Sequence, residues 1–135
     1  MRQRIVVDTN VYVSRFLRPD SVPGRAVAKV WMEAIPLLSA ETWWELRVVL
    51  LRPKFQPYIQ PHTVSPFLRK VWDISDVIRI PSPIRACRDP RDDKFLEVAV
   101  HGSADAIVTG DADLLALDPF RGVAILTPAA YLGVK

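Results

Sequence analysis

The sequence predicts a three-layer α/β fold, in which helices cover both faces of a central five-stranded parallel sheet. Short runs rich in Val and Ile alternate along the chain with longer segments whose apolar residues recur every three or four positions. Parallel strands need a crossover connection, usually a helix, so this alternation favours a parallel sheet. Polar residues directly follow several apolar runs, as expected of loops at the carboxyl edge of such a sheet.

The first half of the chain predicts two strands, two helices and a proline-rich connection. A β-branched run stops at Asp8, as a buried parallel strand does where it meets a polar loop. Pro53 ends the second helix, because proline lacks the N–H that a helix interior needs. The expected elements are a strand at 5–7, a helix at 24–34, a strand at 36–39, a helix from Ser39 or Thr42 to about residue 52, and a connection at 53–66.

The second half predicts three more strands with helices between them. The pair Asp89-Pro90 is typical of a helix start, with aspartate as the N-cap and proline at the first helical position. The expected elements are a helix at 64–73, a strand at 77–80, a helix from Asp89 to about Gly102, strands at 106–109 and 123–126, and short helices at 112–117 and after Thr127-Pro128.

Length and composition are those of an ordinary globular domain. The 135 residues suit one domain spanning 1–135, and half of them are apolar. No uncharged apolar run approaches the roughly 18 residues that a membrane span needs, and the run after the basic N-terminus is too short for a signal peptide, so we expect a cytoplasmic location. The single cysteine, Cys87, excludes an internal disulfide and is expected to be structural. The net charge of +3 suits a polyanionic partner.

Acidic residues from distant parts of the sequence are expected to meet at the carboxyl edge of the sheet. Asp8 and Asp111 directly follow predicted strands, and Asp93 falls in the first turn of a predicted helix. Glu45 lies about one turn into its helix, on the side away from Val49, and its placement is the least constrained. Neighbouring carboxylates repel one another unless a hard cation binds between them, so the pattern predicts a Mg²⁺ or Mn²⁺ site.

Such a site has a defined chemistry and an ordinary alternative. A bound Mg²⁺ contacts phosphate oxygens and lowers the pKa of an attacking water, and a pair of ions would also stabilise the leaving oxygen. Taken singly, however, Asp8 is also typical of a turn at a strand end, and Asp111 of a helix cap. Asp93 is equally typical of an N-terminal helix charge, and Glu45 of a solvated helix acid. Only their joint position at one sheet edge favours the metal site.

Four blocks of the sequence resemble the PIN-domain family, and together they span nearly the whole chain. The order of the blocks is most similar to the VapC-like branch, the ribonuclease toxins of toxin–antitoxin pairs. The blocks are Asp8-Thr9-Asn10; Glu45 followed by Val49-Leu50 and Arg52-Pro53-Lys54-Phe55; Asp89-Pro90-Arg91-Asp92-Asp93-Lys94-Phe95-Leu96-Glu97; and Thr109-Gly110-Asp111-Ala112-Asp113-Leu114-Leu115.

The resemblance implies a PIN-like fold and a metal-dependent ribonuclease that hydrolyses RNA with Mg²⁺ or Mn²⁺. It also implies a homodimer and a cognate antitoxin protein that blocks the acidic site. The implied catalytic and metal-binding acids are Asp8, Glu45, Asp93 and Asp111, with Asp113 as an accessory metal ligand, and Asn10 and Thr109 supporting them.

The third acid is ambiguous, because Asp92 and Asp93 are adjacent and only one of them can point into the site. Asp93 is the choice that matches the apolar spacing of Phe95 and Leu96 to the family pattern. Glu97, one helical turn further on, either approaches the metal or pairs with a basic residue, and we favour the pairing.

Basic and aromatic residues supply candidate contacts to RNA. Arginines such as Arg85 and Arg91 fall near the predicted edge, where they can contact phosphates, although surface arginines are common. Tyr12, Trp43 and Trp44 can stack on unpaired bases, but aromatic residues more often fill a core or a dimer interface.

Two other classes of protein compete with the nuclease interpretation. A phosphohydrolase or receiver domain also uses strand-end aspartates with Mg²⁺. The first would need an aspartate where Asn10 stands, and the second would need adjacent acids after the first strand. The remaining alternative is a catalytically inactive RNA-binding or protein-interaction module with the same fold.

Overall fold

The computed structural model describes residues 2–133 and contains one sheet of five parallel strands. The strands lie in the order β3-β2-β1-β4-β5, so the first strand of the chain is the central one. Their bounds are β1 Arg4–Val7, β2 Ile35–Leu38, β3 Asp76–Val77, β4 Ala106–Val108 and β5 Ala124–Leu126. The predicted five-stranded parallel sheet is therefore confirmed.

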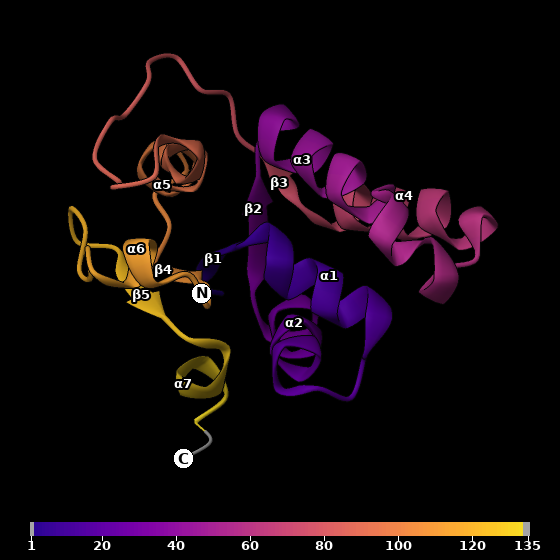
Figure 1. Cartoon of the computed structure of the whole chain (residues 1–135). Helices are drawn as coiled ribbons and strands as arrows, with labels where there is room; N and C mark the ends of the chain where they lie inside the picture. Colours follow the sequence, from indigo (N-terminus) through magenta and orange to yellow (C-terminus); the bar gives the residue numbers. More distant parts are fainter. Residues whose placement is uncertain (1, 134–135) are drawn as a thin grey trace.

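Helices cover both faces of this sheet (Figure 1). Along β1, Ile5 and Val7 pack in one apolar cluster with residues of α1 to α4 and α7, whereas Val6 packs in the other with α5 and α6. Their bounds are α1 Thr9–Leu17, α2 Val22–Glu33, α3 Ala40–Leu50, α4 Val64–Ile74, α5 Asp93–His101, α6 Ala112–Leu115 and α7 Pro128–Leu132. Both faces of β1, β2 and β4 are buried, which explains why these strands lack the apolar–polar alternation of a half-exposed sheet.

Short 3₁₀ turns occupy segments in which the apolar residues lack a regular spacing. The expected connection at 53–66 holds the 3₁₀ helices η1 Pro53–Tyr58 and η2 Pro61–Thr63, and α4 begins within it at Val64. Asp89 caps a 3₁₀ turn, η3 Pro90–Asp92, and not α5 itself. The helical segment predicted from Asp89 thus opens with a 3₁₀ turn before α5 starts at Asp93.

Two elements differ from the sequence prediction. Residues 9–17, which were expected to begin as a polar loop, form α1 with Asp8 as its N-cap residue. The third strand is Asp76–Val77 and not 77–80. Ile78 donates one further hydrogen bond, to Leu38 O at 2.7 Å, but β2 then ends, because the Ser39 amide donates to the Thr42 hydroxyl instead. Residues 79–80 consequently have no β2 backbone left to pair with.

The aromatic candidates divide between the interior and the surface. Tyr12 is buried, and Trp43 packs edge-on against Trp72 while donating from Nε1 to Leu68 O at 2.9 Å. These two side chains serve packing. Trp44 is 54% exposed, and the guanidinium of Arg47 lies 4.9 Å from its ring centre.

Candidate active site

Asp8 and Asp111 are brought together by neighbouring strands, β1 and β4. Asp8 follows β1, and its amide donates to Val108 O at 3.0 Å, which extends the pairing of the two strands. Thr109, fully buried at the end of β4, donates from Oγ1 to Asp8 Oδ2 at 2.6 Å. The same hydroxyl accepts from the Asp111 amide at 2.9 Å. One hydroxyl of Thr109 thus contacts both acids.

A group of three carboxylates forms beside this pair. Asp92, Asp111 and Asp113 each offer an oxygen within 4.8 Å of the other two. Asp111 caps α6, with Oδ1 accepting from the amides of Asp113 and Leu114. Oδ2 of Asp92 is buried and has no hydrogen-bond partner among the described residues. A buried carboxylate oxygen without a donor costs free energy, so the arrangement fits a hard divalent cation that binds oxygen ligands.

The structure brings Asp92 and not Asp93 to this group. Asp93 is buried against the segment 86–87, where its Oδ1 accepts hydrogen bonds from the amides of Ala86 at 3.1 Å and Cys87 at 2.7 Å. Neighbouring residues in a helix point about 100° apart, so two adjacent aspartates cannot face the same site. The η3 turn before α5 sets which of them does. The spacing of Phe95 and Leu96, which favoured Asp93, depends only on α5 and does not report the 3₁₀ turn before it.

Glu45 on α3 is held by two contacts. Thr9, at the start of α1, donates from Oγ1 to Glu45 Oε2 at 2.8 Å. Lys94, at the start of α5, places Nζ 3.3 Å from Glu45 Oε1. The charge of Glu45 is also felt at Asp8, whose pKa it helps to raise. The least constrained of the predicted acids therefore lies near the strand-end pair.

The electrostatics of the site are those of crowded anions. Burial raises the pKa of Asp8, and the charges of Asp111 and Glu45 add to this rise, while the hydrogen bond from Thr109 opposes it. Burial, with the charges of Asp111 and Asp8, raises the pKa of Asp92 to about 7. A carboxyl group that keeps its proton near neutral pH is one from which a cation must displace that proton.

Two contacts of the site were not predicted, and one predicted contact is not formed. Thr9 and Lys94 both hold Glu45, and both lie next to acids that the sequence singled out. Asn10 is exposed, and its side chain makes no hydrogen bond within the part of the chain that the structure describes. The residue that supports the acids from α1 is thus Thr9, whose side chain points inward one position before Asn10.

Comparison with known families agrees with this geometry. A model of the PIN domain matches residues 4–113. The chain belongs to the PIN-domain family. A relative of this PIN domain, an uncharacterized protein of Methanocaldococcus jannaschii, is 31% identical over 116 residues, which cover 84% of this chain and 74% of the relative.

Solved structures share the fold of this PIN domain. VapBC2 from Rickettsia felis, bound to a DNA fragment from its promoter, matches with a TM-score of 0.59 and 10% identity, over 92% of this chain and 98% of that chain. A protein of Pyrobaculum aerophilum matches with a TM-score of 0.61 and 18% identity, over 98% and 88%. FitAcB from Neisseria gonorrhoeae matches with a TM-score of 0.58 and 19% identity, over 92% and 97%. At these identities, the likeness concerns the fold alone.

PIN domains are generally nucleases, and this one retains the acidic group that such chemistry needs. None of the helices in residues 2–133 is long and apolar enough to cross a membrane. The carboxylate oxygens of the site can bind a divalent cation. The Lys94 ammonium lies beside Glu45 and can contact an anionic group.

Proposed function

We propose that this PIN domain is a metal-dependent endoribonuclease that hydrolyses RNA phosphodiester bonds with Mg²⁺ or Mn²⁺. The observation that carries the proposal is the orphaned, buried Oδ2 of Asp92 within reach of two further carboxylates. The proposed metal-binding and catalytic acids are Asp8, Glu45, Asp92 and Asp111, with Asp113 as an accessory ligand. Asp92 takes the third place, which the sequence had assigned to Asp93, because Asp93 is occupied by two backbone amides.

In this proposal, residues of the chain orient the carboxylates that bind the metal, and one of these carboxyl groups loses a proton. When bound, the cation supplies a Lewis acid that polarises the phosphate and acidifies a water molecule. Thr109 keeps Oδ2 of Asp8 oriented, and Thr9 does the same for Oε2 of Glu45. A bound cation would displace the proton of Asp92, whose pKa is raised by burial and by the neighbouring anions. Lys94 offers a positive charge for a phosphate next to Glu45.

We further propose that the chain is the cytoplasmic toxin of a toxin–antitoxin pair and acts as a homodimer. The support is the VapC-like order of its sequence blocks, together with the fold it shares with the VapBC2 and FitAcB structures. A cognate antitoxin would then block the acidic site, for which an arginine side chain is suited, because guanidinium groups bind carboxylates through paired hydrogen bonds. Co-expression with the product of an adjacent gene would test this, since a toxin alone should arrest growth and its antitoxin should restore it.

The test of the proposed activity is cleavage of a labelled RNA panel. Purified protein is incubated with tRNA, ribosomal RNA fragments and single-stranded RNA, with and without Mn²⁺ or Mg²⁺. We expect metal-dependent cleavage by the wild type that Asp8→Asn and Asp92→Asn abolish. Binding of RNA without cleavage under any condition would instead identify a non-catalytic RNA-binding module. Cleavage that persists in both variants would show that the nuclease is not this carboxylate site.

A further inference from the structure

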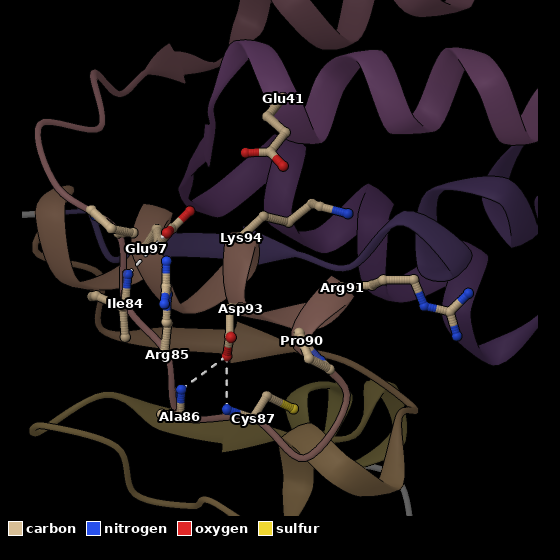
Figure 2. A pocket seen from close by; sticks show the side chains of 11 residues that line it. Glu41, Ile84, Arg85, Ala86, Cys87, Pro90, Arg91, Asp93, Lys94 and Glu97 are labelled. Atoms are coloured by element: carbon tan, nitrogen blue, oxygen red, sulfur yellow. Dashed lines mark hydrogen bonds between the residues drawn. The ribbon is translucent and has the colours of Figure 1, made fainter.

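An open pocket of about 580 Å³ lies between the start of α3, the start of α5 and the segment 83–87 (Figure 2). Lys94 connects the two sites, since it lines the pocket and places its ammonium 3.3 Å from Glu45. The volume falls within the range of roughly 300–1,000 Å³ that is typical of small-molecule sites. Because Lys94 borders both the pocket and Glu45, a phosphate bound by its ammonium would bring the neighbouring nucleotide toward this pocket.

The wall formed by residues 84–87 is fixed by two acids of α5. Asp93 accepts from the amides of Ala86 and Cys87, and Glu97 accepts from the Ile84 amide at 2.9 Å (Figure 2). These hydrogen bonds to charged acceptors are stronger than neutral ones, and they anchor a segment that has no strand partner. The pocket is thus preformed and does not need a loop to close over it. Asp93, which is not placed with the metal ligands, has its role here.

Glu97 is a largely buried side chain of this pocket that can accept a hydrogen bond from a ligand. It is 9% exposed, and in Figure 2 its carboxylate projects into the space below Glu41. Oε2 accepts a hydrogen bond from the Ile84 amide, whereas Oε1 makes no hydrogen bond to another group within the described residues 2–133. A largely buried carboxylate with one free oxygen accepts a hydrogen bond and donates none, so it selects a donor on the ligand.

Positive charges border the same pocket. Lys94 and Arg85 line it together with Arg91, while Glu41 and Glu97 supply acceptors. This mixture fits a nucleotide better than it fits an acidic peptide, because a nucleotide joins an anionic phosphate to a base with N–H donors. Phosphate contacts position the strand, and base contacts specify it.

We propose that this pocket binds one unpaired RNA base next to the scissile phosphate and that Glu97 selects a base with an exocyclic amino group. Cytosine, adenine and guanine each have such a group. Uracil has none, and its single N–H donor on that edge, N3–H, lies between two carbonyl oxygens that a carboxylate repels. The inference rests on the proposed ribonuclease function and adds its specificity: cleavage beside C, A or G is favoured over cleavage beside U.

The substitution Glu97→Gln tests the proposal, because it replaces a hydrogen-bond acceptor in the pocket with a donor. The glutamine oxygen still accepts from the Ile84 amide, and its NH₂ group then points into the pocket as a donor. We measure cleavage of oligouridine strands that contain a single cytidine, with Mn²⁺ present. We expect the wild type to prefer the cytidine site by about 10-fold, the scale of one good base contact. Glu97→Gln should lose or reverse this preference, whereas the surface control Glu33→Gln should keep it. Equal cleavage at all sites by the wild type would overturn the proposal while leaving the ribonuclease function intact.

A second measurement does not depend on cleavage. Metal-free protein labelled with ¹⁵N is titrated with CMP and, separately, with UMP, and the amide signals of Ile84, Ala86 and Cys87 are followed by NMR. We expect CMP to shift these signals at lower concentration than UMP, and we expect Glu97→Gln to reverse the order. This result would support the base pocket even if no RNA were cleaved. Equal responses to the two nucleotides, or none, would overturn it, and an acidic peptide that shifts the same signals in their place would identify a protein-binding pocket.

Discussion

Asp92 and Asp93 are neighbours in sequence, but their surroundings assign them different tasks. The Asp92 carboxyl faces Asp111 and carries an unsatisfied buried oxygen, whereas Oδ1 of Asp93 accepts from two backbone amides of the segment 84–87. A like charge nearby destabilises an ionised carboxylate, while amide donors stabilise it. The surroundings of Asp92 therefore favour binding of a cation, whereas Asp93 holds the segment 84–87 in place.

The paired variants Asp92→Asn and Asp93→Asn should therefore differ in activity. Loss of a residue that merely supports a metal ligand costs about 10- to 100-fold, so loss of the ligand Asp92 should lower metal-dependent cleavage by at least about 100-fold. Asp93→Asn keeps an acceptor oxygen for Ala86 and Cys87 and should retain most activity. Single-turnover cleavage rates at saturating Mn²⁺ provide the comparison. A large loss in Asp93→Asn with full activity in Asp92→Asn would reverse the assignment.

The titration of Asp92 should be visible in the stability of the metal-free protein. Its pKa is about 7 in the folded chain and near 3.8 when unfolded, so the folded state holds an extra proton between these values. The stabilisation is complete below the lower pKa and is lost as pH rises through about 7. Relative to wild type, Asp92→Asn should gain unfolding temperature as pH rises from about 4 to about 7, in the presence of a chelator. A constant difference between the two proteins would contradict the raised pKa.

At the scale of elements, α3 presents Glu45, and a capping box fixes where α3 begins. The Ser39 hydroxyl accepts from the Thr42 amide at 3.2 Å, and the Thr42 hydroxyl accepts from the Ser39 amide at 3.0 Å. Ser39→Ala should cost about 1 kcal/mol of unfolding free energy, the usual loss for an N-cap residue. Urea denaturation of this variant and of the exposed-serine control Ser65→Ala would measure the difference. Equal midpoints would show that the box adds nothing to stability.

The capping signal illustrates what the sequence could and could not predict about elements. Both candidate caps of α3, Ser39 and Thr42, contribute to the box. The helix α1 was not predicted, because Val11, Tyr12 and Val13 are consecutive apolar residues without the helical spacing. All three are buried, since α1 lies between the sheet and other helices of its layer. A run of three consecutive buried apolar residues is as typical of a strand as of a helix, so the spacing did not identify α1.

At the scale of the whole molecule, the parallel sheet is what gathers the acids. The bond between Thr109 and Asp8 joins residues 101 positions apart, and it exists because β4 pairs with β1. The rule that ligands bind at the carboxyl ends of parallel strands was enough to predict Asp8 and Asp111 as neighbours. It was not enough to choose Asp92, or to find Thr9 and Lys94, because those depend on the exact turn and rotation of α5 and α1 against the sheet.

Because the acids come from β1, β4, η3 and α3, a cation that binds them should hold distant parts of the chain together. Binding only to the folded state stabilises a protein by about 2.7 kcal/mol when the free metal is 100 times its Kd. We therefore expect Mn²⁺ to raise the unfolding midpoint of the wild type in urea, in a concentration-dependent way. Asp111→Asn should lose most of this gain, although asparagine still caps α6, because a carboxylate ligand is missing.

The matched control for this experiment is Asp20→Asn, an exposed aspartate outside the site, which should respond to Mn²⁺ as the wild type does. The stability of the metal-free protein provides a second test. Asp111→Asn removes a negative charge that repels Asp8 and Asp92 and raises the pKa of both. Without metal, that variant should be at least as stable as the wild type, and with metal it should be less stable. A variant that gains as much stability from Mn²⁺ as the wild type would show that Asp111 is not a metal ligand, and the crowded carboxylates would then not form a metal site.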